Sequence, residues 1–250
     1  CFLVVTAWMI SASKEINGPP GKVISFVVTI VISAFLVFQP DFGQACLILF
    51  GWSVVYFVAG AHILLLIGVA ASTIGLGSFA YTYSEHFARR IDGFLSPDLD
   101  PKTQLGYATN AIQEGGFFGV GVGEGQVKWS LPDAHTDFII AVAAEEYGFV
   151  LVGLILAIYA GIVCISLARL LRERDIFVRL AGTGLVCMFG IQAVINIGVA
   201  ARLLPAKGMT LPFVSYGGSS LIAGGITIGF LLALTRSRPQ KNVADIFIKG

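Results

Sequence analysis

A cluster of acidic residues and a histidine lies beside and inside an apolar stretch, in the run SLPDAHTDFIIAVAAEEYG (130–148). Asp137 falls at the start of a helix predicted from about Phe138 onward, and Glu145 follows about 12 Å further along its axis. Eight residues turn about 80° beyond two full turns, so Asp137 and Glu145 are expected on neighbouring faces and Glu146 on a nearly opposite one. A carboxylate that faces lipid costs about 2.5–3.5 kcal/mol. The acids are therefore predicted to face a polar cavity or a buried partner, although capping the helix is an alternative for Asp137.

The glycine-rich run GGFFGVGVGEGQVKW (115–129) lacks the features of a nucleotide-binding loop. It contains no GxxxxGK followed by Ser or Thr, and no βαβ pattern surrounds it, so neither a P-loop nor a dinucleotide fingerprint is present. A flexible loop is predicted instead. Lys128, with Arg89 and Arg90, supplies the main positive charge of the surrounding polar region. Basic groups at a membrane surface suit a lipid phosphate or diphosphate, and solvated loop charges are the alternative.

The polar segment LLPAKGMTLPFVSYGGSS (203–220) joins two apolar stretches. Pro205 and Pro212 prevent a continuous helix, and irregular backbone near a membrane is tolerated where it lines a cavity or is covered by protein. Its last part is rich in hydroxyl groups that could hydrogen-bond a polar ligand, on Ser215, Tyr216, Ser219 and Ser220. In QPDFGQ (39–44), Asp41 follows a helix-ending proline, and there a simple turn and a functional acid fit equally well.

The elements that must position these groups are apolar helices. Hydrophobic residues make up 56% of the 250 residues and charged residues 12%, whereas soluble domains carry roughly 25% charged residues. An all-α polytopic membrane protein is therefore predicted, with a single membrane domain over 1–250. Because a span needs about 20 residues, seven spans, some of them short, are expected at 1–12, 23–38, 45–60, 63–82, 138–168, 180–200 and 219–235.

The net charge and the cysteines give no support for nucleic acid or zinc as a ligand. The net charge of +1 gives no reason to expect nucleic acid as a partner, and the four scattered cysteines form no CxxC or Cys/His cluster that would suggest zinc. Three basic regions share one side if the spans alternate: the connection 13–22, the residues after 168 and the C-terminal tail. That side is predicted to be cytoplasmic, so the long polar stretch 83–137 faces outward. Because the chain begins inside an apolar run, we interpret it as a fragment that lacks its N-terminal part.

Three motifs together resemble the SEDS family of bacterial cell-wall polymerases, the FtsW, RodA and SpoVE proteins. They are QPDFG (39–43), LPDAHTDFIIAVAAEEYG (131–148) and LLPAKGMTLPFVSYGGSS (203–220), and the resemblance runs over essentially all 250 residues. It is strongest to the FtsW branch, through GEGQVKWSLPDAHTDF and LPAKGMTLPFVSYGGSS. The resemblance implies ten spanning helices, of which this chain would hold the fourth to the tenth. It also implies a long extracytoplasmic loop and a cytoplasmic C-terminus in the bacterial inner membrane.

The resemblance implies a peptidoglycan glycosyltransferase that polymerises lipid II, an undecaprenyl-diphosphate-linked disaccharide pentapeptide, during cell division. By motif match Asp137 is the family's essential acid, and a carboxylate there could be the general base for a weakly nucleophilic sugar hydroxyl. Cations must neutralise the departing diphosphate, and Lys128 and Arg90 are the candidates. The further candidates for binding substrate or shaping the cavity are Asp41, Glu145, Ser215, His135 and Gln104.

Partners and alternatives also follow from the resemblance. The expected partners are a class B penicillin-binding transpeptidase, other divisome proteins and membrane lipid. The family suggests a divalent cation, Mg²⁺ or Mn²⁺, but no ligand spacing in this chain identifies one. Three other functions remain open: a transporter that moves lipid II across the membrane, a scaffold that only recruits the transpeptidase, and an elongation polymerase of the RodA type.

Overall fold

A computed structural model describes residues 1–15, 18–39, 41–60, 62–96, 103–132, 134–205 and 208–236, without the side chains of His86 and Arg90. Over these ranges the chain forms helices and no strands. The helices are α1 (Phe2–Ala12), α2 (Gly21–Phe38), α3 (Phe42–Val58), α4 (Ile63–Tyr83), α5 (Glu85–Leu95), α6 (Gln104–Gly115), α7 (Val127–Ser130), α8 (Ile139–Leu170), α9 (Ile176–Ala200) and α10 (Gly218–Thr235).

The seven predicted spans coincide with seven of these helices, so the all-α polytopic fold is confirmed. Among the described residues, α2, α4, α8, α9 and α10 are long and apolar enough to cross a membrane, while α1 and α3 are shorter apolar helices. A spanning segment must satisfy its backbone hydrogen bonds internally. For that reason an apolar run of this length is sufficient to specify a helix.

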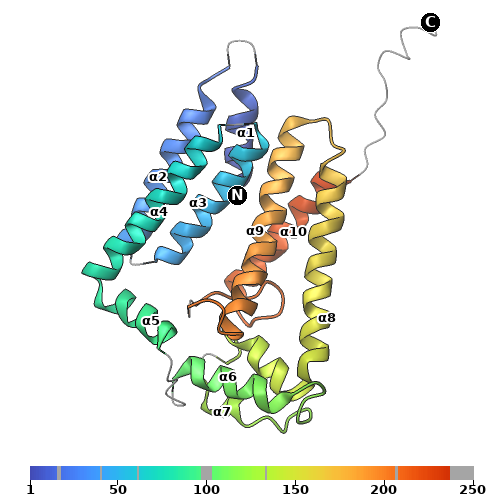
Figure 1. Cartoon of the computed structure of the whole chain (residues 1–250). Helices are drawn as coiled ribbons and strands as arrows, with labels where there is room; N and C mark the ends of the chain where they lie inside the picture. The colour runs from blue at the N-terminus through green and yellow to red at the C-terminus, as the bar shows by residue number, and fades with distance from the viewer. Residues whose placement is uncertain are drawn as a thin grey trace, which may run out of the picture.

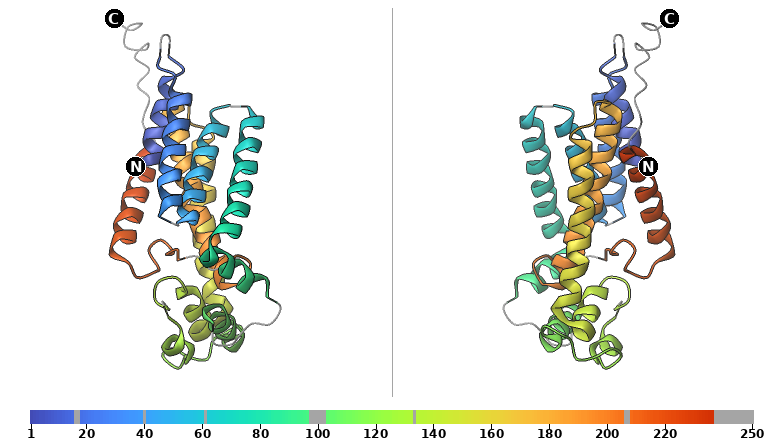
Figure 2. Two further views of the ribbon diagram at one scale, coloured as in Figure 1. Left: turned by 90° about the vertical axis from the view of Figure 1, so that its left-hand side faces the viewer. Right: turned by 90° about the vertical axis from the view of Figure 1, so that its right-hand side faces the viewer.

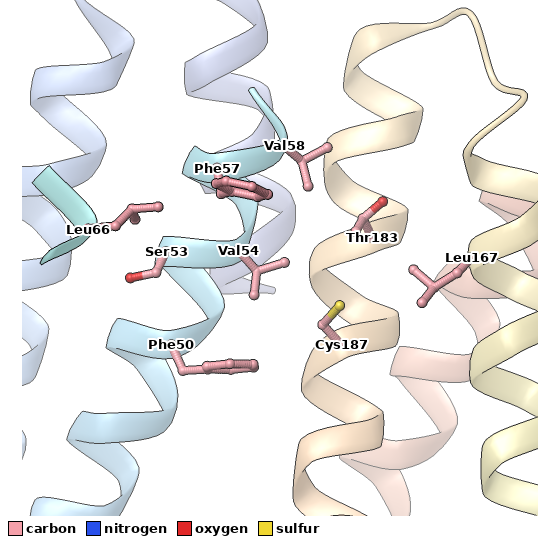
Figure 3. A pocket seen from close by; sticks show the side chains of 9 residues that line it. All are labelled: Phe50, Ser53, Val54, Phe57, Val58, Leu66, Leu167, Thr183 and Cys187. Atoms are coloured by element: carbon pink, nitrogen blue, oxygen red, sulfur yellow. The ribbon is translucent and has the colours of Figure 1, made fainter. Parts of the chain in front are cut away.

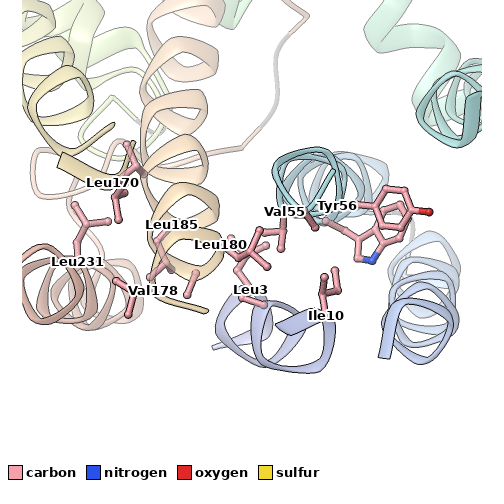
Figure 4. Close-up of a cluster of buried hydrophobic side chains, with 14 residues drawn as sticks. Leu3, Ile10, Val55, Tyr56, Leu170, Val178, Leu180, Leu185 and Leu231 are labelled. Carbon is pink, nitrogen blue, oxygen red and sulfur yellow. The ribbon is translucent and has the colours of Figure 1, made fainter. Parts of the chain in front are cut away.

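The helices form a bundle in which α9 holds the central place. It contacts α1, α3, α8 and α10, as Figure 1 and the side views in Figure 2 show. The main apolar core lies among these helices (Figure 4), and its buried residues include Leu3, Ile10, Val55, Leu180, Leu185 and Leu231. The connections α1–α2 and α8–α9 lie at one end of the bundle, and helices α5 to α7 lie at the other (Figure 1).

The polar region 83–137 is more structured than the long loop that the sequence predicts, because it contains helices α5, α6 and α7. Ser84 caps α5 by accepting a hydrogen bond from the Phe87 N–H, and Thr103 caps α6 by accepting one from the Gly106 N–H. These hydroxyl groups accept hydrogen bonds from backbone N–H groups that have no partner within the first turn of a helix. Helix α6 packs along the first part of α8 and so ties the region to the bundle.

Residues 116–126 of the glycine-rich run form a loop, as predicted, and backbone hydrogen bonds hold this loop against α8. The Val120 and Gly121 N–H groups donate to the Glu145 and Glu146 carbonyls, at 2.9 and 3.2 Å. In return, residues 149 and 150 of α8 donate to the carbonyls of residues 116 and 117. These hydrogen bonds can form because the backbone of α8 is not helical at Gly148, which has φ 73° and ψ −174°.

Replacing Gly148 by Ala is expected to destabilise this junction. A Cβ atom there would lie 2.3 Å from the Phe117 carbonyl oxygen, and a left-handed φ costs a residue with a side chain about 1–2 kcal/mol more. The apparent Tm in detergent should fall, and proteases should cut the 116–125 run faster. Gly153→Ala in the same helix is the control, because its Cβ would meet nothing within 4 Å. Equal behaviour of the two variants would contradict this account.

Candidate active site

An apolar cluster forms the base of the region that contains Asp137. Leu105, Ala108 and Ala111 from α6 pack in it with Val127 of α7 and Val199 of α9. The segment that leads into α8 contributes the buried residues Leu131, Ala134 and Phe138, and the first turn of α8 contributes Ala141. The cluster therefore holds two parts of the chain in fixed positions relative to each other. One is α7, which carries Lys128, and the other is Phe138, the residue next to Asp137.

Three consecutive backbone carbonyls, those of residues 135–137, are each held by a hydrogen bond from a distant part of the chain. The His135 carbonyl accepts from the Tyr216 N–H at 2.9 Å, and the Thr136 carbonyl accepts from the Ser215 hydroxyl at 2.5 Å. The Asp137 carbonyl accepts from the Asn196 side-chain amide at 3.1 Å. We call this arrangement the carbonyl clamp. Its donors come from α9 and the α9–α10 connection, so it positions residues 135–137 without using the Asp137 carboxylate.

Asn196 was missed in the sequence and is central to the clamp. Its amide Nδ2 also donates to the Met209 carbonyl at 2.6 Å, so one side chain joins the Asp137 segment to the α9–α10 connection. The residue is buried, and its Oδ1 has no hydrogen-bond partner in the described part of the chain. A lone Asn inside the apolar run FGIQAVINIGVA was a usable signal, because polar residues within spans are costly and often functional.

Asp137 lies just outside α8, half-buried, where the α9–α10 connection passes beside it. The N-cap of α8 is Phe138, so neither Thr136 nor Asp137 occupies the capping position and the capping alternative was wrong. The Asp137 Oδ2 atom lies 3.1 Å from the position that a Cβ atom would take on Gly208. The carboxylate therefore rests against a residue without a side chain, a second feature that sequence reasoning missed.

Glu145 is buried, with 1% of its surface exposed, and has the buried partner that the sequence predicted. Its Oε1 accepts hydrogen bonds from the N–H groups of Gln126 and Val127, at 2.7 and 3.0 Å. Its Oε2 is buried without a hydrogen-bond partner among the described residues and lies 2.9 Å from the Cβ position of Gly125. Glu145 therefore holds the start of α7. The expected angle between Glu145 and Asp137 does not apply, because Asp137 precedes the helix.

Glu146 and Lys128 form an ion pair between α8 and α7. The Lys128 Nζ lies 2.5 Å from the Glu146 Oε1, and it also donates to the Gly123 carbonyl at 3.2 Å. Both side chains are largely shielded from solvent. Lys128 therefore has an acidic partner within the protein, and its role as a diphosphate ligand stays a prediction.

The remaining predicted site residues occupy different places. Asp41 caps α3 by accepting from the Gln44 N–H at 3.0 Å, which matches the turn alternative. Gln104 is exposed at the first turn of α6. The His135 ring is exposed and meets the Tyr216 ring edge-on at 5.8 Å. Ser215 is buried, and its hydroxyl also accepts from the Leu211 N–H. The Arg90 side chain lies outside the described part of the structure.

A separate apolar cavity of about 470 Å³ opens between α3 and α9 (Figure 3). It is lined by Phe50, Ser53, Val54, Phe57, Val58, Leu66, Leu167, Thr183 and Cys187. Cys187 lies nine residues before Asn196 in α9, which corresponds to about 13 Å along the helix. The cavity contains no carboxylate or basic side chain, so the candidate chemistry lies elsewhere.

Sequence comparisons identify relatives over nearly the whole chain. Residues 1–240 match the FtsW, RodA and SpoVE family, described as "Cell cycle protein". The "Probable peptidoglycan glycosyltransferase FtsW" of Caulobacter vibrioides is 42% identical over 238 residues, which are 95% of this chain and 61% of the relative. "Stage V sporulation protein E" of Bacillus subtilis is 37% identical over 215 residues, 83% of this chain and 58% of the relative. The chain thus spans about three fifths of the length of these relatives.

Solved structures agree with the sequence comparisons. A chain from "Structural coordination of polymerization and crosslinking by a peptidoglycan synthase complex" superposes with a TM-score of 0.74 at 31% identity, covering 96% of this chain and 68% of that one. The rod shape determining protein RodA of Thermus thermophilus superposes with a TM-score of 0.62 at 29% identity, covering 96% and 64%. With its apolar helices, the chain is a multi-pass protein of the bacterial inner membrane. The matched family and the two kinds of relative together show that the chain belongs to the SEDS family of FtsW, RodA and SpoVE proteins.

Proposed function

We propose that this chain, as one membrane domain, carries the polymerising site of a peptidoglycan glycosyltransferase that acts on lipid II during cell division. The observation that carries the proposal is the carbonyl clamp, which fixes the backbone of Asp137 independently of its carboxylate. A carboxylate whose backbone is fixed by two neighbouring elements is held in a defined place, which suits it to chemistry. The relatives named as glycosyltransferases support the same reaction class.

Asp137 is the proposed general base. A sugar hydroxyl of one lipid-linked glycan attacks the anomeric carbon of another, and the bond from that carbon to the diphosphate breaks. The hydroxyl proton passes to the Asp137 carboxylate, while the diphosphate leaves with the bonding electron pair. General base catalysis of this kind contributes about 10²–10⁴-fold to a rate. The leaving group is already activated, so the reaction needs no nucleotide.

The site faces the outer side of the membrane in this proposal. Lys14, Arg172 and Arg174 lie in connections at one end of the bundle, and basic connections are typical of the cytoplasmic side. The carbonyl clamp and helices α5 to α7 lie at the opposite end (Figure 1). The lipid II headgroup would reach Asp137 from the outer leaflet.

Lys128 and Arg90 are the proposed cations that neutralise the negative charge of the departing diphosphate. Lys128 is paired with Glu146, so a diphosphate would compete with this carboxylate for the ammonium group. Glu145 and Ser215 shape the site by holding the start of α7 and residue 136. Asp41, His135 and Gln104 remain candidates for contacts with the substrate.

A protein-held cation is not part of the proposal. In the described part of the chain, no three His, Cys, Asp or Glu side chains gather closely enough to hold a metal ion. The described residues therefore build no Mg²⁺ or Mn²⁺ site by themselves, and none of the steps above depends on one.

The test uses a protein of full family length that contains this chain, reconstituted with a class B penicillin-binding partner and lipid II. Formation of glycan strands supports the enzyme. Movement of lipid II across the vesicle without strands would favour the transporter. Strand synthesis that persists when Asp137 is replaced by Ala would favour the scaffold.

Gly208→Ala is expected to slow polymerisation without removing any functional group. The new methyl group would press on the Asp137 Oδ2 atom, 3.1 Å away, and displace the carboxylate by a few tenths of an ångström. Since a misplacement of 1 Å can cost about 10²-fold, we expect roughly a three- to tenfold lower kcat in the glycan assay. Gly225→Ala, whose Cβ meets nothing within 4 Å, should retain the normal rate. An unchanged kcat in Gly208→Ala would mean that this contact does not position the base.

A further inference from the structure

The glycine-rich run exposes a group of large apolar side chains on one short loop, residues 116–123, which we call the apolar loop. Phe117, Phe118 and Val122 are 76%, 85% and 70% exposed. The loop sequence GFFGVGVG contains no charged or polar side chain. Such a concentration of exposed apolar groups marks an interaction surface.

The apolar loop continues an exposed apolar surface of α8. The Phe117 and Phe149 ring centroids lie 6.3 Å apart, and the next residues of α8 on this surface, Val150 and Leu154, are also exposed. The backbone hydrogen bonds between the loop and α8 attach the two surfaces rigidly to each other. What covers this side of α8 is therefore expected to meet the loop as well.

The length of α8 places the loop at the membrane boundary. Residues 139–148 supply the buried side chains of the first part of α8, and α6 packs there, whereas Phe149–Leu170 is mostly exposed. These 22 residues extend about 33 Å, close to the hydrocarbon thickness of about 30 Å. Their far end carries Arg169, with Arg172 just beyond it. The near end, where the loop joins, must then lie at the level of the headgroups.

Part of the backbone of the apolar loop is hydrogen-bonded within the protein. The N–H groups of Gly119, Val120 and Gly121 donate to carbonyls at positions 115, 145 and 146, and the carbonyls of Gly116 and Phe117 accept from α8. Unpaired peptide groups are what exclude irregular backbone from lipid. The internal hydrogen bonds of these groups, and the absence of a charged side chain that would have to be desolvated, favour a lipid surface over a polar protein partner.

We propose that the apolar loop is a membrane-interface anchor that inserts Phe117, Phe118 and Val122 at the headgroup–acyl boundary of the leaflet beside α5 to α7. Aromatic residues favour this boundary, and apolar groups buried about 5–10 Å deep hold interfacial segments in place. Because the loop is bonded to the residues around Glu145, the anchor sets the height of the extramembrane region above the leaflet. This role does not depend on the reaction assigned to Asp137.

The test is photo-crosslinking of the chain in vesicles of phosphatidylethanolamine and phosphatidylglycerol. A benzophenone amino acid replaces Phe118, and in a matched protein it replaces Glu124, an exposed residue just beyond the loop. Both sites are exposed, so both proteins are expected to fold. Mass spectrometry should find at least fivefold more lipid adduct at position 118 than at 124.

Two results would overturn the anchor. One is equal or absent lipid adduct at position 118 in the vesicles. The other comes from the same probe in intact bacterial membranes: an adduct at position 118 to a protein instead of lipid would show that the loop is a protein-docking surface.

Discussion

Asp137→Asn is expected to lower glycan polymerisation by at least about 100-fold, because the amide cannot accept the proton of the attacking sugar hydroxyl. The fold should survive, since the carbonyl clamp uses only the backbone oxygens of residues 135–137. The measurement is glycan strand length and rate from lipid II in the reconstituted complex, with the apparent Tm determined on the same samples. Asparagine has nearly the size of aspartate, so the contact with Gly208 is retained.

Glu85→Gln is the matched control for this variant. Glu85 is another extramembrane acid, but it is exposed and forms only a local ion pair with Arg89, at 3.0 Å. Its replacement should change neither rate nor stability, because exposed pairs of this kind contribute little. If Asp137→Asn kept more than a tenth of the activity, Asp137 would not be the base. If it lost activity together with a large drop in Tm, the carboxylate would instead be part of the fold.

Glu145→Ala is expected to cause a large loss of stability where α7 meets α8. It removes the only acceptor that the described structure shows for the N–H groups of Gln126 and Val127. Val127 is buried whereas Gln126 is exposed, and one buried donor left without a partner costs about 1–3 kcal/mol. For a protein of this size that corresponds to a Tm lower by roughly 2–12 °C. Glycan synthesis should fall in parallel, because α7 and the ion pair of Lys128 lose their anchor.

Two further variants separate the hydrogen bonds of Glu145 from its charge. Glu145→Gln keeps a side-chain oxygen for the two N–H groups, so most of the stability should return. Glu124→Ala removes an exposed acid from the same region and should leave the Tm unchanged. Equal losses in Glu145→Gln and Glu145→Ala would show that the negative charge matters more than the acceptor geometry.

Together, Asp137 and Glu145 explain why acids stand beside and inside an apolar stretch. Glu145 and Glu146 are both internal partners, one of backbone N–H groups and the other of Lys128. Asp137 differs in position, because it lies just before α8, whose N-cap is Phe138. One run of sequence therefore combines two structural acids with one proposed for catalysis, and hydropathy alone does not distinguish them.

Local sequence information was sufficient for the helices and insufficient for the connections. The boundaries of α1, α2 and α10 follow their apolar runs to within two residues, because each span makes its hydrogen bonds internally. The sequence did not predict the hydrogen-bond partners of the glycine-rich run, because they lie elsewhere in the chain. The N–H groups of Val120 and Gly121 bond to residues 145 and 146, and no periodicity within the run records such pairing.

The amino-acid sequence by itself determined the all-α membrane fold, the seven apolar helices and the family, since these depend on composition, span length and contiguous motifs. Only the tertiary structure decided what each polar residue contacts. It brought Asn196, Gly208 and Ser215 to the Asp137 segment across 59 to 79 positions of chain, and it paired Lys128 with Glu146. The physical reason is that a side-chain hydrogen bond is specified by distance and direction in space, which residues far apart in sequence acquire only when the helices pack.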